Sequence, residues 1–290
     1  MIDDLNDRIK KLYKILGSCE LCPRKCKVNR LKDEKGYCKS GEDLIVSSIG
    51  PHFGEEEPLV GDHGSGTIFL TNCNLRCIYC QNYDISQLGH GSHMSLEELA
   101  QNMLKLQKMG CHNINLVTPT HFVPQLVKSI KIATETGLKT PIVYNSGGYE
   151  SIKTLKLLSG IIDIYMPDIK YSDCETAKNY SGAPDYFEVC KDAIREMHAQ
   201  VGELKLQRGI ARKGLIIRHL ILPNRTAGSI EILKFISELS EDSYVNIMEQ
   251  YRPAYKARNY SKIERPIKIS EYHEVIDAAK KFGIHRGFFD

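Results

Sequence analysis

The chain has 290 residues, of which 42% are hydrophobic, and it carries a formal net charge of +3. That length can bury a sizeable core, and the composition excludes an intrinsically disordered protein. The 39 basic and 36 acidic residues are interspersed, which argues against nucleic-acid binding and against binding to a membrane surface. The sequence has no secretory leader and no apolar run of the ~20 residues that a membrane span needs, so we expect a soluble, cytoplasmic protein.

The first predicted element is a helix over residues 2–16, where apolar residues recur at helical spacing before Gly17. A strand is expected at 44–49, and we predict a small N-terminal metal module over residues 1–66. Between the helix and the strand lie four cysteines with the spacing C-x2-C-x3-C-x11-C, namely Cys19, Cys22, Cys26 and Cys38. Four thiolates form a closed first shell, which favours structural zinc. A second [4Fe-4S] cluster is the alternative, although the spacing differs from the bacterial ferredoxin run.

Residues 67–290 alternate between short apolar runs and longer segments of helical period. The predicted strands are 67–71, 113–118, 141–145, 161–166, 214–222 and 244–249. The predicted helices are near 96–109, before Gly137, and at 150–158, 185–201, 227–240 and 270–282. Ser95 and Glu98 form a capping-box pattern at the start of the first of these helices. The alternation predicts a parallel sheet, because each crossover helix returns the chain to the same end. A six-stranded partial barrel and a doubly wound sheet both fit this order.

A second cysteine cluster lies in "TNCNLRCIYCQN" at 71–82, directly after the first predicted strand of this region. Cys73, Cys77 and Cys80 have the spacing C-x3-C-x2-C, and active sites of parallel barrels gather at such strand ends. A four-iron cluster normally takes four cysteines, so three would leave one iron open to a ligand that reacts.

Two other interpretations of this loop stay open. Zinc could be held by the three thiolates with His90 or His93, and Cys111 could complete an ordinary electron-transfer cluster. Structural zinc sites more often use C-x2-C knuckles, so the spacing favours the reactive cluster. Ten cysteines without a leader also argue against disulfides, since cytosolic thiols stay reduced.

Cys73-x3-Cys77-x-Tyr79-Cys80 resembles the motif of the radical SAM superfamily, including the aromatic residue before the last cysteine. The stretches "CPRKCKVNR", "VYNSGGYE", "IDIYMPDIKY", "LIIRHLILP" and "NIMEQYRP" resemble the branch related to pyruvate formate-lyase activating enzymes, and the resemblance covers nearly the whole chain from Cys19. It implies an α/β fold in which residues 67–290 form a partial (β/α)6 TIM-like barrel that follows the N-terminal four-cysteine module.

The resemblance further implies a [4Fe-4S] cluster on Cys73, Cys77 and Cys80, with S-adenosylmethionine at the open iron. Reductive cleavage would give a 5'-deoxyadenosyl radical that abstracts hydrogen from a substrate. The electron donor would be a flavodoxin or ferredoxin, and the target a protein glycine. A radical SAM enzyme that modifies a peptide or small molecule is one alternative. An iron-sulfur electron-transfer or scaffold protein without SAM cleavage is another.

Lys170 and Arg218 are the predicted catalytic residues, and both are also predicted to bind the cofactor. Lys170 matches a lysine that in related activating enzymes meets the SAM carboxylate, and Asp168 lies two residues earlier on the same face of an extended chain. A surface ion pair is the alternative for these two residues. Arg218 lies in an apolar strand, where a buried guanidinium needs an anionic partner, while its neighbour His219 would point the other way.

Asp168 and four further residues are also predicted to bind the cofactor. Tyr79 would meet the adenine or pack at the barrel mouth. Thr118 and Thr120 stand where many members of the superfamily have a Gly-Gly-Glu segment that holds the methionyl amino group, and Asn145 ends the third predicted strand. His121 is expected to cap the following helix, and a proton relay is the alternative. The stretch "PHFGEEEP" at 51–58 combines His52 with three glutamates, which could be a ligand set but is more typical of a solvated loop.

Overall fold

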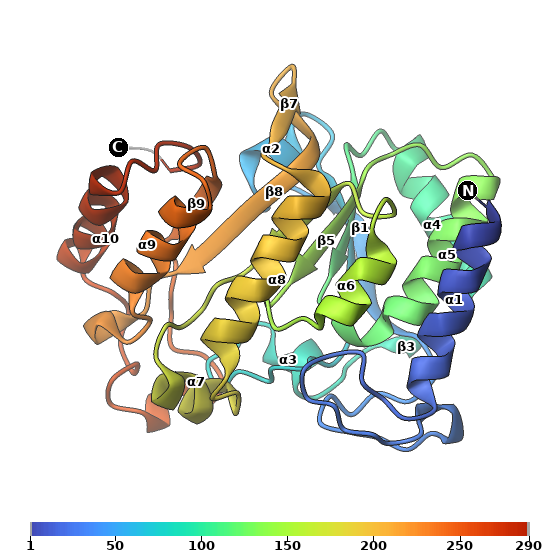
Figure 1. The fold of residues 1–290 in the computed structure, drawn as a ribbon, viewed down its shortest axis with the longest axis horizontal. Coiled ribbons are helices and arrows are strands. Elements are labelled where there is room, and N and C mark those ends of the chain that lie inside the picture. Colours follow the sequence, from blue (N-terminus) through green and yellow to red (C-terminus); the bar gives the residue numbers. More distant parts are fainter. Residues whose placement is uncertain (1, 289–290) are drawn as a thin grey trace.

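The computed structural model describes residues 2–288, which form a mixed α/β fold (Figure 1). The strands are β1 (Ile45–His52), β2 (Ser65–Leu70), β3 (Ser92–His93), β4 (Ile114–Val117), β5 (Ile142–Ser146), β6 (Ile164–Pro167), β7 (Lys205–Gln207), β8 (Ile210–Leu220) and β9 (Tyr244–Met248). The helices are α1 (Ile2–Leu16), α2 (Glu57–Val60), α3 (Tyr83–Ser86), α4 (Leu96–Lys108), α5 (Val123–Glu135), α6 (Ile152–Leu158), α7 (Cys174–Ser181), α8 (Tyr186–Val201), α9 (Ser229–Leu239) and α10 (Ile269–Lys281).

The strands form one sheet in the order β3-β1-β2-β4-β5-β6-β8-β7, with β9 also paired to β8. The six strands β2, β4, β5, β6, β8 and β9 run parallel to one another. Within residues 2–288 no strand pairing joins β9 to β1 or β3, so the sheet stays open. The parallel strands also lie in chain order, without the reversal of order that a doubly wound sheet has. The fold is therefore a partial barrel, which confirms the predicted α/β class.

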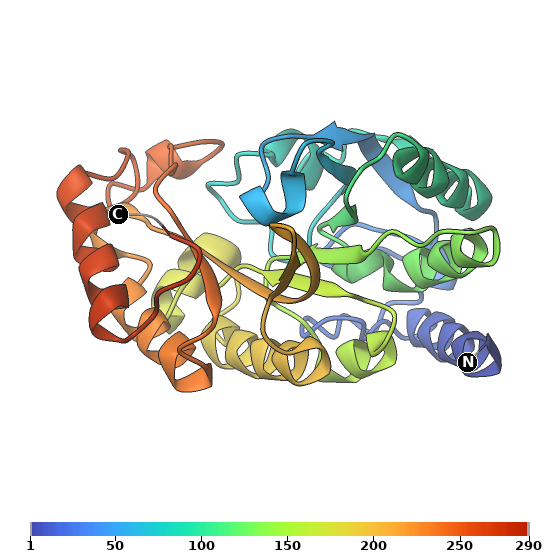
Figure 2. The same ribbon diagram turned by 90° about the horizontal axis from the view of Figure 1, so that it is seen from above.

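The central strands of the sheet are formed by apolar runs of the sequence. Every residue of β5 and of β6 is buried, as expected for strands covered on both faces. Helices with one apolar face pack on the outer side of the curved sheet, from α4 and α5 through α8 to α9 and α10 (Figure 2). The capping box predicted for Ser95 and Glu98 is confirmed at the start of α4.

The six predicted strands of residues 67–290 correspond to these six parallel strands, and the predicted helices to α1, α4, α5, α6, α8, α9 and α10. The sequence interpretation missed the short elements, namely α2, α3, α7, β3 and β7. The strand predicted at 44–49 is β1, which pairs antiparallel with β2 as part of the main sheet. The sheet thus starts before residue 67, and the division of the chain at residue 66 stays a prediction.

The gap in the barrel is bordered by the segment between β1 and β2, which contains α2. In Figures 1 and 2, α2 lies on the other side of β8 from α8, and contacts join both helices to β8. Leu59 of α2 is fully buried and packs in a small apolar cluster with Ile216 of β8. This packing brings the acidic residues before and within α2 to the inner face of the barrel.

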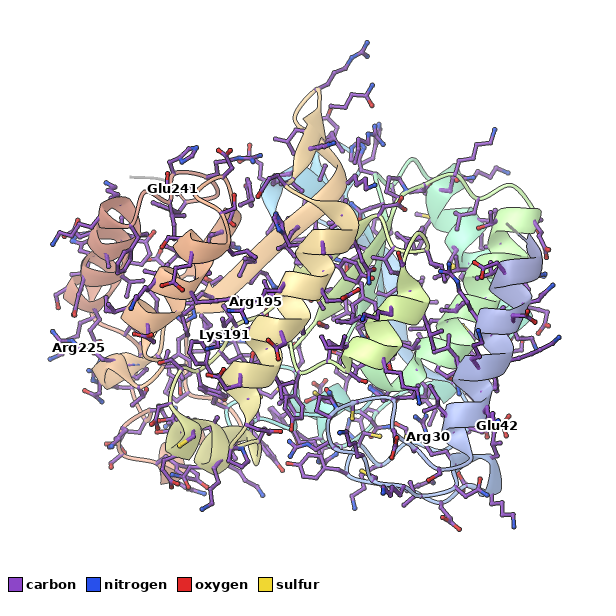
Figure 3. The ribbon with its side chains drawn as sticks, viewed as in Figure 1. Arg30, Glu42, Lys191, Arg195, Arg225 and Glu241 are labelled. Atoms are coloured by element: carbon purple, nitrogen blue, oxygen red, sulfur yellow. The ribbon has the colours of Figure 1, made fainter. Side chains whose placement is uncertain are left out.

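The loops that follow α1 lie against the carboxyl ends of the strands. Figure 3 labels Arg30 among these loops. Its guanidinium is 1% exposed and donates to the carbonyl oxygens of Gly41 and His121. Arg24 donates to the carbonyl oxygens of Asn74 and Ser181. Two arginines therefore attach the N-terminal loops to the barrel. Across residues 2–288, no helix combines the length and the apolar character that crossing a membrane requires.

Candidate active site

A cavity of about 290 Å³ lies at the carboxyl ends of the parallel strands. Residues from the ends of β2, β4, β5, β6, β8 and β9 line it, which is the position expected for the active site of a parallel barrel. The predicted site residues that line this cavity are Cys73, Cys77, Tyr79, Cys80, Thr118, Asn145, Asp168, Lys170 and Arg218. The fold thus brings together side chains that are up to 145 positions apart in the sequence, from Cys73 to Arg218 (218 minus 73).

The three cysteines come from a tight loop after β2. Asn72 and Arg76 adopt left-handed backbone conformations there, with φ of 66° and 54°. Each sulfur accepts a hydrogen bond: the Cys73 Sγ from the backbone N–H of Leu75 at 3.3 Å, the Cys77 Sγ from Ser181 Oγ at 3.0 Å, and the Cys80 Sγ from Ser86 Oγ at 3.1 Å. Donors directed at sulfur are what thiolate ligands of iron-sulfur clusters receive, and they tune the cluster's potential.

Burial raises the pKa of the Cys73 thiol to about 12, and the neighbouring Cys77 adds to the effect. Burial also raises the pKa of Cys80, against the hydrogen bond from Ser86. Since only thiolates bind metal, binding at this loop has to release protons.

The three cysteines suit a cubane cluster, because in a four-iron cluster each thiolate binds a different iron and three thiolates leave one iron without a cysteine. His90, His93 and Cys111, the alternative fourth ligands, are not among the residues that line the cavity of the three cysteines.

Asp168 connects the charged side chains of the cavity. Its two carboxylate oxygens accept from Lys170 Nζ at 2.6 Å and from Arg218 Nε at 2.8 Å, and Arg218 Nη2 donates to Asn145 Oδ1 at 2.6 Å. Burial opposes the ionisation of Asp168, but Arg218 and Lys170 outweigh it and hold its pKa below the ordinary value. Burial likewise opposes the charge on Lys170, and Asp168 outweighs it and raises the pKa of the amine. The ion pair of Asp168 and Lys170, for which a surface position was the alternative interpretation, is part of a network whose side chains are only 16% exposed.

Arg218 and His219 point to opposite sides of β8, as expected of neighbouring strand residues. Arg218 lines the cavity, whereas the His219 ring is buried between the Ile169 carbonyl and the Ser229 hydroxyl. Burial lowers the pKa of His219 to about 4, so its ring is neutral near pH 7.

Glu55 and Glu56 reach the same network from the open side of the barrel. Arg218 Nη1 lies 3.7 Å from Glu55 Oε2 and 3.6 Å from Glu56 Oε1, and the two glutamate side chains are only 9% and 5% exposed. The expectation of a solvated loop at 51–58 is wrong for these two residues. The sequence gives no sign of their burial, which follows from the packing of α2 against β8.

Tyr79 is 5% exposed and lies at the centre of a group of tyrosine rings. Its ring meets those of Tyr171, Tyr180 and Tyr251 edge to face, with centroids 6.2, 6.3 and 5.9 Å away. Such contacts fix the ring in place. Tyr79 therefore both packs at the barrel mouth and lines the cavity, so packing and adenine contact are compatible.

Thr118 and Thr120, which both follow β4, lie in different surroundings. Thr118 lines the cavity in a left-handed conformation, with φ of 61°, which is strained for a β-branched residue. Thr120 is fully buried outside the lining, and its hydroxyl donates to Glu150. The His121 ring bonds the Thr71 carbonyl through Nε2 and does not cap a helix, contrary to expectation.

The four N-terminal cysteines line a second, small cavity together with Arg30 and His121. Cys26 Sγ accepts from the backbone N–H of Tyr37 at 3.4 Å. Gly36 leaves room for this sulfur, because an added Cβ would lie 2.8 Å from it. The hydrogen bonds of the buried Arg30 guanidinium go to carbonyl oxygens, so its charge suits an anionic centre such as a tetrathiolate metal complex.

Comparison with known proteins places these features in a family. The model of the radical SAM superfamily matches residues 67–203. An uncharacterised protein of Methanocaldococcus jannaschii is 32% identical, over 97% of this chain and 79% of its own length. The chain belongs to the radical SAM superfamily. Membership indicates a radical SAM enzyme that uses a [4Fe-4S] cluster and S-adenosylmethionine, and the cavity with three cysteines suits both.

Other members of the superfamily are more distant. A pyruvate formate-lyase-activating enzyme of Clostridium pasteurianum is 28% identical, over 63% of this chain and 73% of its own length. The crystal structure of HydG, a maturase of the [FeFe]-hydrogenase, superposes with a TM-score of 0.54 at 14% identity. It covers 99% of this chain, which spans 63% of the HydG chain, and at that identity the likeness shows the radical SAM fold alone.

Proposed function

We propose that Cys73, Cys77 and Cys80 hold a [4Fe-4S] cluster whose fourth iron binds S-adenosylmethionine. One observation carries the proposal: three hydrogen-bonded cysteine sulfurs line the same cavity as a partly buried lysine and arginine at the ends of the barrel strands. Bound together, the cluster and S-adenosylmethionine supply a 5'-deoxyadenosyl radical able to abstract hydrogen.

The side chains of the cavity would orient S-adenosylmethionine. Lys170 uses one ammonium proton on Asp168 and has two more donors, which suit the ligand's carboxylate. Arg218 is held by Asp168 and Asn145 and adds positive charge to the same wall. Tyr79 offers a fixed aromatic surface for the adenine. Thr118 offers its hydroxyl and backbone for the methionyl amino group, while Thr120 would have to leave Glu150 to take part.

The chemistry of the relatives suggests the target. We infer that the enzyme abstracts hydrogen from a protein, with a glycine as the favoured site, because the Clostridium pasteurianum relative is a pyruvate formate-lyase-activating enzyme. A flavodoxin or ferredoxin would deliver the electron. The reaction would take place in the cytoplasm, where a reducing environment protects an oxygen-sensitive cluster.

A second metal centre is proposed on Cys19, Cys22, Cys26 and Cys38. The enclosed cavity and the buried positive charge of Arg30 support a negatively charged tetrathiolate complex. A zinc ion and a second [4Fe-4S] cluster can each be bound by four cysteine thiolates, and both complexes are negatively charged. Metal analysis distinguishes them, because zinc adds one zinc per chain and a cluster adds about four irons.

The first experiment uses anaerobically reconstituted protein, reduced with dithionite and mixed with S-adenosylmethionine. We expect 5'-deoxyadenosine and methionine as products, and a change in the electron paramagnetic resonance signal of the cluster when S-adenosylmethionine binds. In the Cys77→Ala variant we expect no product and a loss of about four irons per chain. The metal of the N-terminal cysteines should remain.

The matched control is Cys174→Ala, which removes an exposed cysteine of α7 and should keep both metals. A cluster signal that S-adenosylmethionine leaves unchanged, without product, would support an electron-transfer protein instead. Retention of all iron in Cys77→Ala would refute the assignment of the cluster ligands.

A further inference from the structure

Glu55 and Glu56 each have one buried carboxylate oxygen that accepts no hydrogen bond. Their side chains are 9% and 5% exposed, and among the described residues the Oε2 atom of each makes no hydrogen bond. A buried acceptor without a hydrogen bond costs roughly 1–3 kcal/mol, and more if it is charged. Native proteins keep such groups where another molecule satisfies them.

The positive charge of Arg218 alone does not explain why both glutamate side chains are buried. Their distances to Arg218 Nη1, 3.6 and 3.7 Å, exceed hydrogen-bond length, whereas Asp168 and Asn145 lie within it. The remaining partner is Asn246 Nδ2, which donates to Glu56 Oε1 at 3.1 Å. Three carboxylates thus face two cations, Arg218 and Lys170, and Lys170 bonds Asp168 alone of the three.

The excess of negative charge favours a further cation. Burial raises the pKa of Glu55 to about 7; Arg218 opposes this increase and Glu56 adds to it. The pair therefore tends to hold a proton, which a bound cation can replace.

The two carboxylates face a cavity of about 430 Å³ along β9. Four of its lining residues are glutamates: Glu55, Glu56, Glu57 and Glu249. Arg218 is the sole basic residue among the described residues that line it, and the aromatic rings of Tyr244, Tyr272 and Phe288 complete the wall. Carboxylates beside aromatic rings are a setting that favours an ammonium group.

This acidic cavity adjoins the cavity of the three cysteines. Arg218, Met248 and Gln250 line both of them. A molecule with its charged end at Glu55 and Glu56 can therefore extend past these residues toward the place where the radical would form.

We propose that Glu55 and Glu56 bind an alkylammonium group of the substrate, so that the substrate of this enzyme is an amine. The proposal rests on the proposed radical function, since it assigns a substrate class to that site. A lysine side chain of a protein is compatible with the protein target proposed above, whereas a free amine would replace that target. A lysine side chain of a peptide and a free amine share this chemistry. Two buried carboxylates provide acceptors for the ammonium protons, and Asn246 holds Glu56 in place.

The test measures binding to the reconstituted full chain by ligand-observed nuclear magnetic resonance. The probes are pentylamine, which is protonated at neutral pH, and 1-pentanol, its uncharged counterpart of similar size. We expect the ammonium ion to bind at least about tenfold more tightly than the alcohol, from the ~1.5–3 kcal/mol of hydrogen bonds to charged groups. Equal affinities in the wild-type protein would overturn the proposal without any variant.

Variants locate the site. In Glu55→Gln/Glu56→Gln the preference for the ammonium ion should fall to within about twofold, because the amides are neutral. The control Glu57→Gln alters an exposed glutamate of the same cavity and should keep the preference. A preference that persists in the double variant would show binding elsewhere and refute the site. If the double variant does not fold, Glu56→Gln alone replaces it.

Two further measurements separate the possible outcomes. N-acetyl-lysine amide that binds more tightly than pentylamine assigns a peptide source, and equal binding assigns a free amine. The assay of 5'-deoxyadenosine on the wild-type protein tests the proposed function by itself. Cleavage of S-adenosylmethionine without an ammonium preference rejects only the amine substrate, whereas an ammonium preference without cleavage rejects the radical function.

Discussion

Asp168 is the residue on which the polar wall of the cavity depends. It stands between Lys170 and Arg218 and binds both through separate oxygens. Without it, two partly buried cations would share the same cavity, and each would lose its strongest opposing charge. The ligand carboxylate proposed for this wall therefore meets cations that are already positioned and already partly neutralised.

The role of Lys170 can be tested by removing its amine. Lys170→Ala should weaken the binding of S-adenosylmethionine about tenfold or more, since a hydrogen bond to a charged group is worth ~1.5–3 kcal/mol. Iron content should not change, because Lys170 does not contact a cysteine sulfur in the hydrogen bonds described. Isothermal titration under anaerobic conditions measures the affinity. The control Lys178→Ala removes a lysine of α7 that is 60% exposed. An unchanged affinity in Lys170→Ala would exclude the role.

Single residues were predictable where their chemistry is rare. Three cysteines at C-x3-C-x2-C, and an arginine inside an apolar strand, stand out in any sequence, and these residues line the cavity. Glu55 and Glu56 do not stand out, because acidic residues in loops are usually solvated. Their burial depends on contacts between α2 and β8, which are more than 150 positions apart. Nothing local in the sequence encodes that contact.

The turn after β5 is the element that joins two strand ends at the site. Gly148 has a φ of +76°, and a Cβ there would lie 2.2 Å from the Asp168 carbonyl oxygen and 2.7 Å from Cys190 Sγ. The ends of β5 and β6 can approach this closely because the residue lacks a side chain. The turn thereby sets the position of the backbone that carries Asp168.

Replacing this glycine should therefore cost more than its backbone conformation alone. Gly148→Ala should lower the free energy of unfolding by about 2–4 kcal/mol, from ~1–2 kcal/mol of left-handed strain plus the clash. Gly160→Ala is the matched control: its φ is +74°, but an added Cβ meets nothing within 4 Å. Gly160→Ala should lower the free energy of unfolding only by the ~1–2 kcal/mol of left-handed strain. Urea unfolding measures both variants, and equal losses would contradict the crowded turn.

Elements were predictable where their patterns are long. The apolar runs of β5, β6 and β8 and the periodic helices α4 and α8 carry enough residues to indicate their type. The eight residues of α7 give little more than two turns, and the three residues of β7 no period at all. Asp173 is the N-cap of α7, where its side chain accepts from the backbone N–H of Thr176. An aspartate at this position is a sequence signal for the start of a helix.

At the scale of the molecule, buried ionisable groups make stability depend on pH. Glu150 is 1% exposed beneath the site, with Thr120 and Tyr144 as partners. Burial raises its pKa to about 7 from 4.5, against the hydrogen bonds from Thr120 and Tyr144. Between these two values the folded chain holds a proton that the unfolded chain releases. Its contribution to stability is thus present below pH 4.5 and is lost as the pH rises through 7.

The variant Glu150→Gln isolates this effect, because glutamine does not titrate. The free energy of unfolding of the variant minus that of the wild type should be about 3 kcal/mol larger at pH 8 than at pH 4, at ~1.36 kcal/mol per pKa unit. Urea unfolding across that range provides the measurement. Glu188→Gln, whose side chain is 75% exposed, should show a flat difference. A flat difference for Glu150→Gln as well would mean that the carboxyl group ionises normally.

The order of strands and helices in the barrel was predictable, because each strand and the helix after it are neighbours in the sequence. Two features of the complete molecule were not. The antiparallel β1 belongs to the main sheet, and the N-terminal loops are fixed to the carboxyl ends of the strands by arginine. Both depend on pairings between distant segments, for which a single sequence holds no periodic signal.

The attachment of the N-terminal loops also sets an order of events in time. Arg24 finds its partner at Ser181, 157 positions later. A ribosome adds residues at ~5–20 per second from the amino end, so the four-cysteine segment waits roughly 10 to 30 seconds before that partner exists. During synthesis, the folding of this segment and its docking on the barrel are therefore separate steps. A metal bound in that interval at the proposed four-cysteine site would be held by a nascent loop before there is an enzyme to receive it.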